Sequence, residues 1–339
     1  MDDIQKYKTN KINELTSAFN TSLISLRNIL VANIKKINKM KIPKKIKIQK
    51  LNTLQKTYNN SVAKITKQYQ TNKIKILSLT SIPKNRNSLL IGINYIGTPN
   101  ELYGCINDTN NIKNMLQQKF SYNNFIFLTD QTNKKPTKDN IINEITKLLV
   151  NSKTGDSLFF LYSGHGTYAL DLNNDELDGQ DELIVPLDAT NINTCISDDE
   201  LNQIIKNNLK EGVQLFMLFD CCFSGTIMDL KYNYIYSDNF NNTTINPNCS
   251  ETISQVIMIS GCKDNQTSAD SIVNYNKNVI NSGAMTFSFL KTIQDLGTNI
   301  SFKTLLVNMR KILSENGYSQ IPQLSSGISI DINNINISF

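Results

Sequence analysis

The chain has 339 residues, of which 40% are hydrophobic and 19% charged, a composition typical of folded globular proteins. It contains no apolar run of about 18 or more residues and no segment with the layout of a secretory signal peptide, which excludes a membrane-spanning helix and predicts a cytoplasmic protein. Six cysteines lack the spacing of a zinc site and one histidine is too few for a Cys/His cage, so we expect reduced thiols.

Charge is divided unevenly along the chain. Residues 1–86 carry 19 Lys and Arg against three acidic residues, whereas residues 87–339 carry 16 against 26. The two segments therefore have electrostatic fields of opposite sign. We place a domain boundary between them, with 1–86 a basic helical extension that is regulatory or a pro-segment and 87–339 the main domain.

The basic segment shows two apolar stripes with residues three or four positions apart, which is typical of one face of a helix. The stripes are Ile12, Leu15, Phe19, Leu23, Leu26, Leu30, Ile34 and Ile37, then Leu51, Leu54, Tyr58, Val62, Ile65 and Tyr69. Pro43 lies between them, where neither helix can comfortably continue. The pattern predicts a helical hairpin whose stripes pack on each other or on the main domain.

The linker of this hairpin, residues 34–50, holds eight lysines. One interpretation is a solvated basic turn. A second is attraction to nucleic acid or to an anionic membrane surface, but the segment lacks the arginines and interleaved aromatic residues that read bases, so we expect no nucleic-acid partner. A third interpretation depends on the chemistry of the main domain.

From Ser88 onward, short apolar runs alternate with helical patterns. The runs are 88–94, 124–128, 156–162, 213–219 and 254–260, and the helical patterns are 107–119, 137–150, 198–209, 284–295 and 301–314. Continuous apolar runs suit strands that are buried on both faces, and their alternation with helices predicts an α/β domain with a mainly parallel sheet. Active sites of such sheets lie beyond the carboxyl ends of the strands, which here are the loops after Asn94, Tyr162, Phe219 and Ser260.

Two of these strand ends carry reactive side chains beside glycines. The third run leads into Ser-Gly-His-Gly with His165, the only histidine, and the fourth into Asp-Cys-Cys-Phe-Ser-Gly with Cys221 and Cys222. An imidazole beside a thiol raises the thiolate fraction and can later protonate a leaving amine. Single histidines and cysteines at strand ends are more often structural, but two such signals on neighbouring buried strands favour catalysis. Backbone N–H groups near Cys222 and Gly166 are candidate oxyanion-hole donors.

At these positions the sequence resembles the metacaspases, calcium-dependent cysteine peptidases of the caspase fold, over nearly all of residues 88–329. Residues 163–166 match the family's Ser-Gly-His-Gly and residues 220–225 its Asp-x-Cys-His-Ser-Gly, which implies that Cys222 is the nucleophile and His165 the base. Weaker matches at 90–112, 259–270, 283–290 and 320–326 follow in the family's order. Phe223 departs from the pattern by replacing a histidine that is not the catalytic base, so we expect activity to survive.

The resemblance implies an α/β fold, a caspase-like three-layer sandwich with a mainly parallel central sheet, here preceded by the N-terminal helical hairpin. It also implies an S1 pocket for Arg or Lys, and the matching residues are Cys105, Asp108, Ser163 and Asp220. Two carboxylates in a dry pocket offer charge-assisted hydrogen bonds to a basic side chain. A pocket for Asp would need arginines, and residues 87–339 contain only Arg310. Helix capping is the alternative role for Asn107 and Asp108.

Further carboxylates are candidate cation ligands. The spacing of Asp171, Asn173 and Asp175 lacks the sixth-position glycine and the twelfth-position glutamate of an EF-hand. The resemblance instead implies Ca²⁺ ligands at Asp181, Asp198, Asp199 and Asp229, with Glu182 as a substitute for Asp181. Calcium would then draw the loop after Cys222 towards the loop before Asp198 and finish the cleft. Helix capping is again the alternative for Asp198 and Asp199.

These observations predict a calcium-dependent cysteine endopeptidase that cleaves protein or peptide substrates after Arg or Lys through a dyad of Cys222 and His165. The lysine-rich hairpin linker would then cover the acidic cleft and be clipped by the enzyme itself on activation. The alternative is a catalytically impaired caspase-fold scaffold that binds other proteins. We expect a monomer.

Overall fold

The computed structural model describes residues 3–77, 85–170, 180–222, 227–235, 242–261, 270–275, 278–337 and 339. The chain divides into two compact units, Met1–Pro83 and Lys84–Phe339. Several positions discussed above lie outside the described residues: Asp171, Asn173, Asp175, Phe223 and the rest of 223–226, and most of 259–270, including Cys262. No helix of the described part of the chain is long and apolar enough to cross a membrane.

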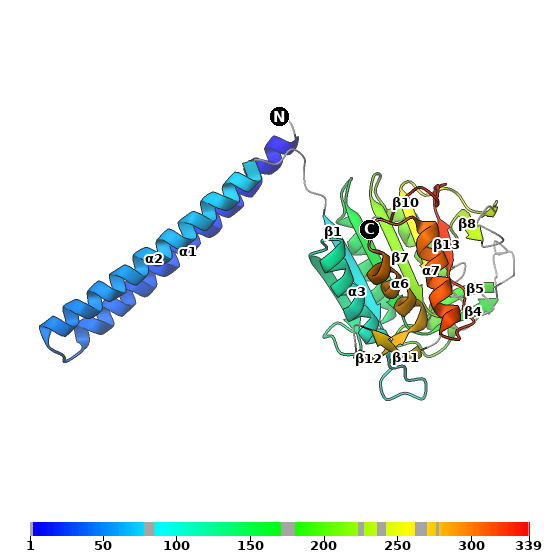
Figure 1. Ribbon diagram of the computed structural model, residues 1–339, viewed down its shortest axis with the longest axis horizontal. Coiled ribbons are helices and arrows are strands. Elements are labelled where there is room, and N and C mark those ends of the chain that lie inside the picture. The colour runs from blue at the N-terminus through cyan, green and yellow to red at the C-terminus, as the bar shows by residue number, and fades with distance from the viewer. Residues whose placement is uncertain are drawn as a thin grey trace. The chain divides into compact units, whose positions relative to one another are not determined.

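The first unit is the predicted helical hairpin, formed by α1 (Asp3–Lys39) and α2 (Lys44–Leu77) (Figure 1). Its apolar stripes pack on each other, as the stacked rings of Phe19 and Tyr69 show, with centroids 4.6 Å apart. Pro43 directly precedes α2, and its carbonyl accepts the first backbone hydrogen bonds of that helix. A proline is favourable there because its missing N–H group would have no partner in the first turn.

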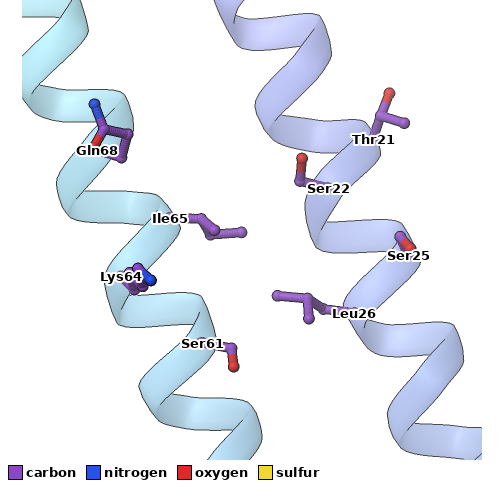
Figure 2. Close-up of a pocket in the computed structure, with 8 residues that line it drawn as sticks. All are labelled: Thr21, Ser22, Ser25, Leu26, Ser61, Lys64, Ile65 and Gln68. Carbon is purple, nitrogen blue, oxygen red and sulfur yellow. The ribbon is translucent and has the colours of Figure 1, made fainter.

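The contact between α1 and α2 is thin in the middle of the hairpin. Leu26 and Ile65 point towards the facing helix (Figure 2), but most of their neighbours are small or polar. A groove of about 700 Å³ remains, and its other lining residues are Thr21, Ser22, Ser25, Ser61, Lys64 and Gln68. None of the hairpin side chains whose burial the structure describes is fully buried.

The second unit is built on an eight-stranded sheet with the order β2-β1-β3-β7-β10-β13-β8-β9. The first five of these strands are parallel and correspond to the five predicted runs: β2 (Asn124–Thr129), β1 (Arg86–Gly92), β3 (Ser157–Ser163), β7 (Gln214–Asp220) and β10 (Gln255–Ser260). The last three are antiparallel: β13 (Gln323–Ser326), β8 (Tyr232–Ile235) and β9 (Asn242–Ile245). The sheet is therefore mainly parallel, as predicted.

Alternate residues of the central strands enter two separate cores. Leu89 and Ile91 face a core shared with α4 (Lys138–Val150) and α5 (Asp198–Asn208). Leu90 faces a second core, completed by α3 (Cys105–Lys119), α6 (Ala284–Leu296) and α7 (Phe302–Glu315), the three helices that cross the near face of the sheet in Figure 1. This arrangement confirms the predicted three-layer α/β sandwich.

Two smaller sheets lie outside the main one and are not predicted by the apolar runs. One contains β4 (Gly166–Leu170), β5 (Gln180–Ile184) and β6 (Ile196–Ser197), and the other is the hairpin of β11 (Asp270–Tyr275) and β12 (Asn278–Gly283). A one-turn helix, η1 (Ile192–Thr194), precedes β6. Both small sheets start or end at the residues that build the candidate active site.

Candidate active site

The carboxyl ends of β3 and β7 bring the two sequence motifs together. The strands are adjacent and parallel, and their last paired residues are Ser163 and Asp220. His165 and Cys222 each follow this pair by two residues. The N–H group of Gly164 donates to the carbonyl of Asp220 at 3.3 Å, so the two chains remain in contact beyond the strands.

The glycine after the histidine is required by this contact. A Cβ atom placed on Gly166 would lie 2.2 Å from the carbonyl oxygen of Cys222 and 3.2 Å from the Cβ of Cys221. No side chain can be accommodated at such a distance from a backbone oxygen. The loop that carries Cys222 therefore lies directly against the loop that carries His165.

The two adjacent cysteines differ in accessibility. All five cysteines of the described residues are thiols. Cys221 is 1% exposed and belongs to the core beside α4 and α5, whereas Cys222 is partly exposed. Of the pair, Cys222 is therefore the thiol that a substrate can reach.

A backbone carbonyl orients the ring of His165. The Nε2 atom lies 2.7 Å from the carbonyl oxygen of Asn100, in the loop between β1 and α3. Because a carbonyl only accepts hydrogen bonds, Nε2 must carry the proton, and the neutral ring keeps its lone pair on Nδ1. The backbone of Asn100 therefore orients the His165 ring. The sequence does not predict this role, because a residue of any type would supply the same carbonyl.

Asp108 and Asp220 form a buried pair of carboxylates beside this dyad. A Cβ atom on Gly283 would lie 2.1 Å from Oδ2 of Asp220 and 3.1 Å from Oδ2 of Asp108. Both carboxylates therefore pack against the same glycine, at the junction of β12 and α6. Asp108 is completely buried, and Asp220 is 4% exposed.

Hydroxyl and backbone groups from β3 and β12 hold Asp108 in place. Ser163 donates to its Oδ2 at 2.8 Å, Ser282 donates to its Oδ1 at 2.5 Å, and the N–H group of Gly283 lies 3.1 Å from Oδ2. The N–H group of Thr286, in the first turn of α6, donates to Asp220 at 2.8 Å. A helix N-terminus stabilises a carboxylate in this position.

These donors do not offset the full cost of burying two like charges. Burial is the main cause that raises the pKa of Asp108 well above its usual range, and the charge of Asp220 raises it further. The hydrogen bonds from Ser282, Ser163 and Gly283 lower this pKa but do not offset the two effects that raise it. A cationic side chain placed against the pair would replace the retained proton.

Asp108 is not a helix cap, so the capping alternative is wrong for both residues proposed for it. Helix α3 begins at Cys105 after Gly104, and no side chain caps it. Asn107 is also inside the helix, and its side chain donates to the carbonyl of Asn281 at 3.1 Å. Cys105 is buried in the first turn, where its carbonyl would meet a Cβ atom on Gly92 at 2.4 Å.

A second set of carboxylates surrounds the start of α5. Asp198 is buried, and its two oxygens accept the N–H groups of Glu182 and Asp199, each at 2.7 Å. Burial and then the charge of Asp229 raise the pKa of Asp198 to about 7. The N-cap residue is Ser197, whose hydroxyl accepts the N–H group of Glu200 at 3.2 Å, while Asp198 and Asp199 lie in the first turn of α5, where the helix dipole favours acidic side chains.

The predicted cation ligands are only partly gathered. Asp229 has a left-handed backbone conformation (φ 42°), and the side chain of Asn202 in α5 donates to its carbonyl at 3.4 Å. Glu182 is buried beside Asp198, and the alternation of side chains along β5 places Asp181 on the opposite face of that strand. Among the described residues, no group of three or more His, Cys, Asp or Glu has the geometry of a metal site. The buried Asp198 and the partly exposed Asp229 repel each other, and they nevertheless have the oxygen chemistry that a hard cation requires.

Comparisons with known proteins identify the family. A family model described as "Metacaspase, peptidase C14 domain" matches residues 86–231, which include both motifs. The chain is 37% identical to Metacaspase-1 of Meyerozyma guilliermondii, and the alignment covers 73% of this chain and 71% of that protein. This chain belongs to the metacaspase family. Metacaspase-1 of Schizosaccharomyces pombe is 35% identical, with 73% and 68% of the two chains covered.

A solved structure supports the fold of this metacaspase. The crystal structure of protein GSU0716 from Geobacter sulfurreducens covers 74% of this chain and 95% of its own, with a TM-score of 0.53 and 23% identity. Together with the three layers described above, family membership confirms the predicted caspase-like fold. It also makes the protein a member of a family of cysteine peptidases.

Some residues of the metacaspase site carry no signal that sequence reasoning could use. Ser282 and Gly283 belong to the small β11–β12 hairpin, which no apolar run announces. Tyr95, whose ring lies 4.6 Å from that of His165, reads as an ordinary core residue in the sequence. These residues are identified as part of the site only because the folded chain places them beside the predicted motifs.

Proposed function

We propose that this metacaspase is a calcium-dependent endopeptidase that cleaves after Arg or Lys through a dyad of Cys222 and His165. The observation that supports the proposal most strongly is the buried pair of Asp108 and Asp220, which lies at the same strand ends as the dyad. A buried pair of acids that retains a proton is suited to a basic side chain and unsuited to an acidic one.

In the proposed mechanism, Nδ1 of His165 takes the proton of the Cys222 thiol, and the thiolate attacks the carbonyl carbon of the scissile bond. Backbone N–H groups beside Cys222 and Gly166 would stabilise the oxyanion. The imidazolium then gives its proton to the leaving amine, and the resulting thioester is hydrolysed by water that His165 deprotonates. The hydrogen bond from Nε2 to Asn100 keeps the ring in the tautomer that both proton transfers require.

The proposed specificity follows from the charges around the pocket. The pair would bind an ammonium or guanidinium group through charge-assisted hydrogen bonds, while Ser163 and Ser282 hold the Asp108 carboxylate in position. The one arginine of residues 87–339, Arg310, donates from α7 to the carbonyl of Pro322 at 3.0 Å. It is therefore engaged elsewhere and supports no pocket for Asp.

Calcium dependence is the second part of the proposal. Asp198 and Asp229 would hold the ion, with Glu182 or Asp181 and Asp199 as further ligands. Bound Ca²⁺ would supply positive charge that offsets the repulsion between the carboxylates. These residues would then tie β5, α5 and the segment after β7 together, and the last of these follows directly from the nucleophile loop.

Self-processing is the third part. Lys41 lies between α1 and α2 outside both helices and is exposed, as a peptide bond must be to enter an active site in an extended form. We propose that cleavage in the lysine-rich linker accompanies activation. We also propose that the protein is cytoplasmic and monomeric. The monomer is supported by the pairing of β13 with β8, because β13 is then not a free edge to which a second chain could add.

Hydrolysis of fluorogenic peptides tests the proposal. Peptides with Arg or Lys at P1 should be cleaved in the presence of Ca²⁺ and not in excess chelator, peptides with Asp at P1 should remain intact, and Cys222→Ala should be inactive. Hydrolysis that is unchanged by the chelator contradicts calcium dependence, and cleavage after Asp contradicts the pocket. N-terminal sequencing after Ca²⁺ addition should find new termini between Lys35 and Arg86 in the active protein only.

The second candidate is the catalytically impaired scaffold, which Phe223 in the nucleophile motif favours. It predicts no hydrolysis of any of these peptides at any Ca²⁺ concentration. Restoring the family's residue with Phe223→His would then produce activity. Activity of the unaltered chain excludes this candidate.

A further inference from the structure

Two tyrosine hydroxyls hold the backbone of His165 from both sides. The N–H group of His165 donates to the hydroxyl of Tyr95 at 3.0 Å. The hydroxyl of Tyr162 donates to the carbonyl of His165 at 2.8 Å. Both polar groups of the His165 backbone are therefore bound to side chains that the proposed mechanism does not use.

The same hydroxyls bind Val185, the first residue after β5. Tyr95 donates to the carbonyl of Val185 at 2.6 Å, and the N–H group of Val185 donates to Tyr162 at 3.1 Å. In the ladder of β4 and β5, Gly166 pairs with Ile184, so His165 and Val185 are next in register. The N–H group of Val185 also donates directly to the carbonyl of His165 at 3.2 Å, so the ladder continues by one residue pair, and the two hydroxyls form additional bridges across that pair.

The bridges are rigid because both tyrosines are buried. Tyr162 is 0% and Tyr95 6% exposed. Burial raises the pKa of both hydroxyls above the ordinary value for tyrosine, so they stay protonated and can each donate and accept. Loss of one partner would leave a buried polar group unsatisfied, which is costly.

The conformation of Tyr95 is fixed from a different strand. Its backbone is left-handed (φ 51°), which is uncommon for a residue with a large side chain. Asp130 follows β2, and its carboxylate accepts the N–H groups of the two residues that flank Tyr95, Asn94 at 2.7 Å and Ile96 at 3.2 Å. The ring of Tyr95 then lies 4.6 Å from the imidazole of His165. Backbone strain of this kind persists where the surrounding structure enforces it.

We propose that Tyr95 and Tyr162 are positioning residues that hold His165 in the ring orientation and tautomer needed for catalysis. The inference rests on the proposed role of His165 as base. It also accounts for Gly164, since a Cβ atom there would lie 2.9 Å from the hydroxyl of Tyr162 and 3.1 Å from that of Tyr95. In this proposal, both tyrosines act through the backbone of His165 and do not contact the reacting atoms.

The first experiment compares Tyr95→Phe with the matched control Tyr122→Phe in the full chain. Tyr122 is 1% exposed, and its hydroxyl has no hydrogen-bond partner among the described residues. Tyr95→Phe keeps the ring but removes the bridge, so kcat should fall about 10- to 100-fold, as for other supporting hydrogen bonds, while KM changes less than about twofold. Tyr122→Phe should leave both unchanged. Equal kcat values for the two variants would overturn the proposal.

The second experiment uses the fact that His165 is the only histidine. Its imidazole nitrogens give the only such signals in an NMR spectrum, so tautomer and pKa are read without assignment. We expect protonated Nε2 in the unaltered chain, and a mixture of tautomers with a shifted pKa in Tyr95→Phe. A purely structural effect would lower the melting temperature and leave the tautomer unchanged, which would contradict the proposal.

The NMR measurement also separates this inference from the proposed function. It can be made on Cys222→Ala protein, which needs no activity. If the chain with Cys222 intact hydrolyses none of the peptides while Tyr95→Phe still changes the tautomer, the proposed function fails and the positioning of the His165 ring stands. If Tyr95→Phe does not fold, Tyr162→Phe tests the other bridge, and an unaltered His165 signal in that variant would count against the proposal.

Discussion

The domain contains two pairs of neighbouring acids that are built in different ways: Asp108 and Asp220 are both buried, whereas in the second pair Asp198 is buried and Asp229 is partly exposed. Asp108 and Asp220 receive four hydrogen bonds from β3, β12 and α6, elements that belong to or border the central sandwich. Asp198 receives the N–H groups of Glu182 and Asp199 and a hydrogen bond from the Glu182 side chain, and the backbone carbonyl of Asp229 accepts from Asn202. Burial raises the pKa of both Asp108 and Asp198, and the second acid of each pair raises it further.

The difference indicates different roles. The first pair is fixed by hydrogen bonds from the sandwich, which suits the pocket for a basic side chain that we propose. The second pair joins β5 of a small sheet, α5 and the segment after β7, so its repulsion acts between elements that no shared strand connects. A rigid pocket suits substrate selection, and a repelling junction between elements suits control by a cation.

Both proposed roles of the acid pairs depend on Cys222 being the nucleophile. Replacing Cys222 with Ala should reduce kcat about 10⁴-fold or more, because no other group can take over covalent attack. The replacement of buried Cys221 with Ala is the control, and it should retain activity at reduced stability. Progress curves with an Arg peptide check both variants, and a Cys221→Ala variant as inactive as Cys222→Ala would show that the wrong thiol has been chosen.

The pocket pair should matter more for specificity than for folding. Asp108→Asn and Asp220→Asn should each lower kcat/KM for Arg peptides by about 10²- to 10³-fold, the loss expected when one member of a buried charge pair is removed. Asp139→Asn, an exposed acid in the first turn of α4, is the matched control. Variants that keep full activity would place the S1 pocket elsewhere.

Binding of a basic side chain should depend on pH through the same pair. Because the pKa of Asp108 is raised, one proton must leave before a cation binds, so KM for an Arg peptide should fall as pH rises through the pKa of the pair. The limit is about tenfold per pH unit for one proton. Steady-state KM values between pH 5 and 9 check this. In Asp108→Asn the slope should vanish, and a KM that rises with pH contradicts the account.

The cation pair should act mainly on stability. The pKa of Asp198 is about 7 in the folded protein, so the folded state binds more protons than the unfolded state between the ordinary Asp range and pH 7. Without calcium, stability should therefore fall as pH rises through this window. Asp198→Asn should remove that fall, a difference of a few degrees in melting temperature.

The measurement is the melting temperature of the full chain at pH 5 and pH 8, in chelator and in Ca²⁺. Calcium should raise the melting temperature of the unaltered chain at pH 8 and have little effect on Asp198→Asn. Identical pH slopes for the two proteins, or equal stabilisation of both by Ca²⁺, would break the contrast between the two pairs.

The sequence predicts the parts of the fold that depend on local pattern. Each parallel strand is a continuous apolar run, and the five helices of the sandwich lie within three residues of the predicted ranges. The strands β4, β5, β11 and β12 are short and follow no apolar run, because their existence depends on pairing with one another. Such pairing requires no continuous apolar run in either strand, because what stabilises it depends on the context of each strand.

The site shows the same division. Glycine-bracketed motifs mark His165 and Cys222, but the orienting carbonyl of Asn100 is independent of residue type. Asp108 is consistent with a cap or a pocket in the sequence, and only the start of α3 at Cys105 decides between them. Tyr95 and Tyr162 resemble core residues because their hydroxyls find partners only after folding.

The most direct test of the account compares two peptides that differ only at P1, one with arginine and one with citrulline, its neutral isostere. If the pair of Asp108 and Asp220 selects a positive charge for attack by Cys222, the unaltered enzyme should show a kcat/KM at least about 10²-fold higher for arginine. In Asp108→Asn this preference should shrink towards unity. Equal cleavage of the two peptides by the unaltered enzyme would contradict the account.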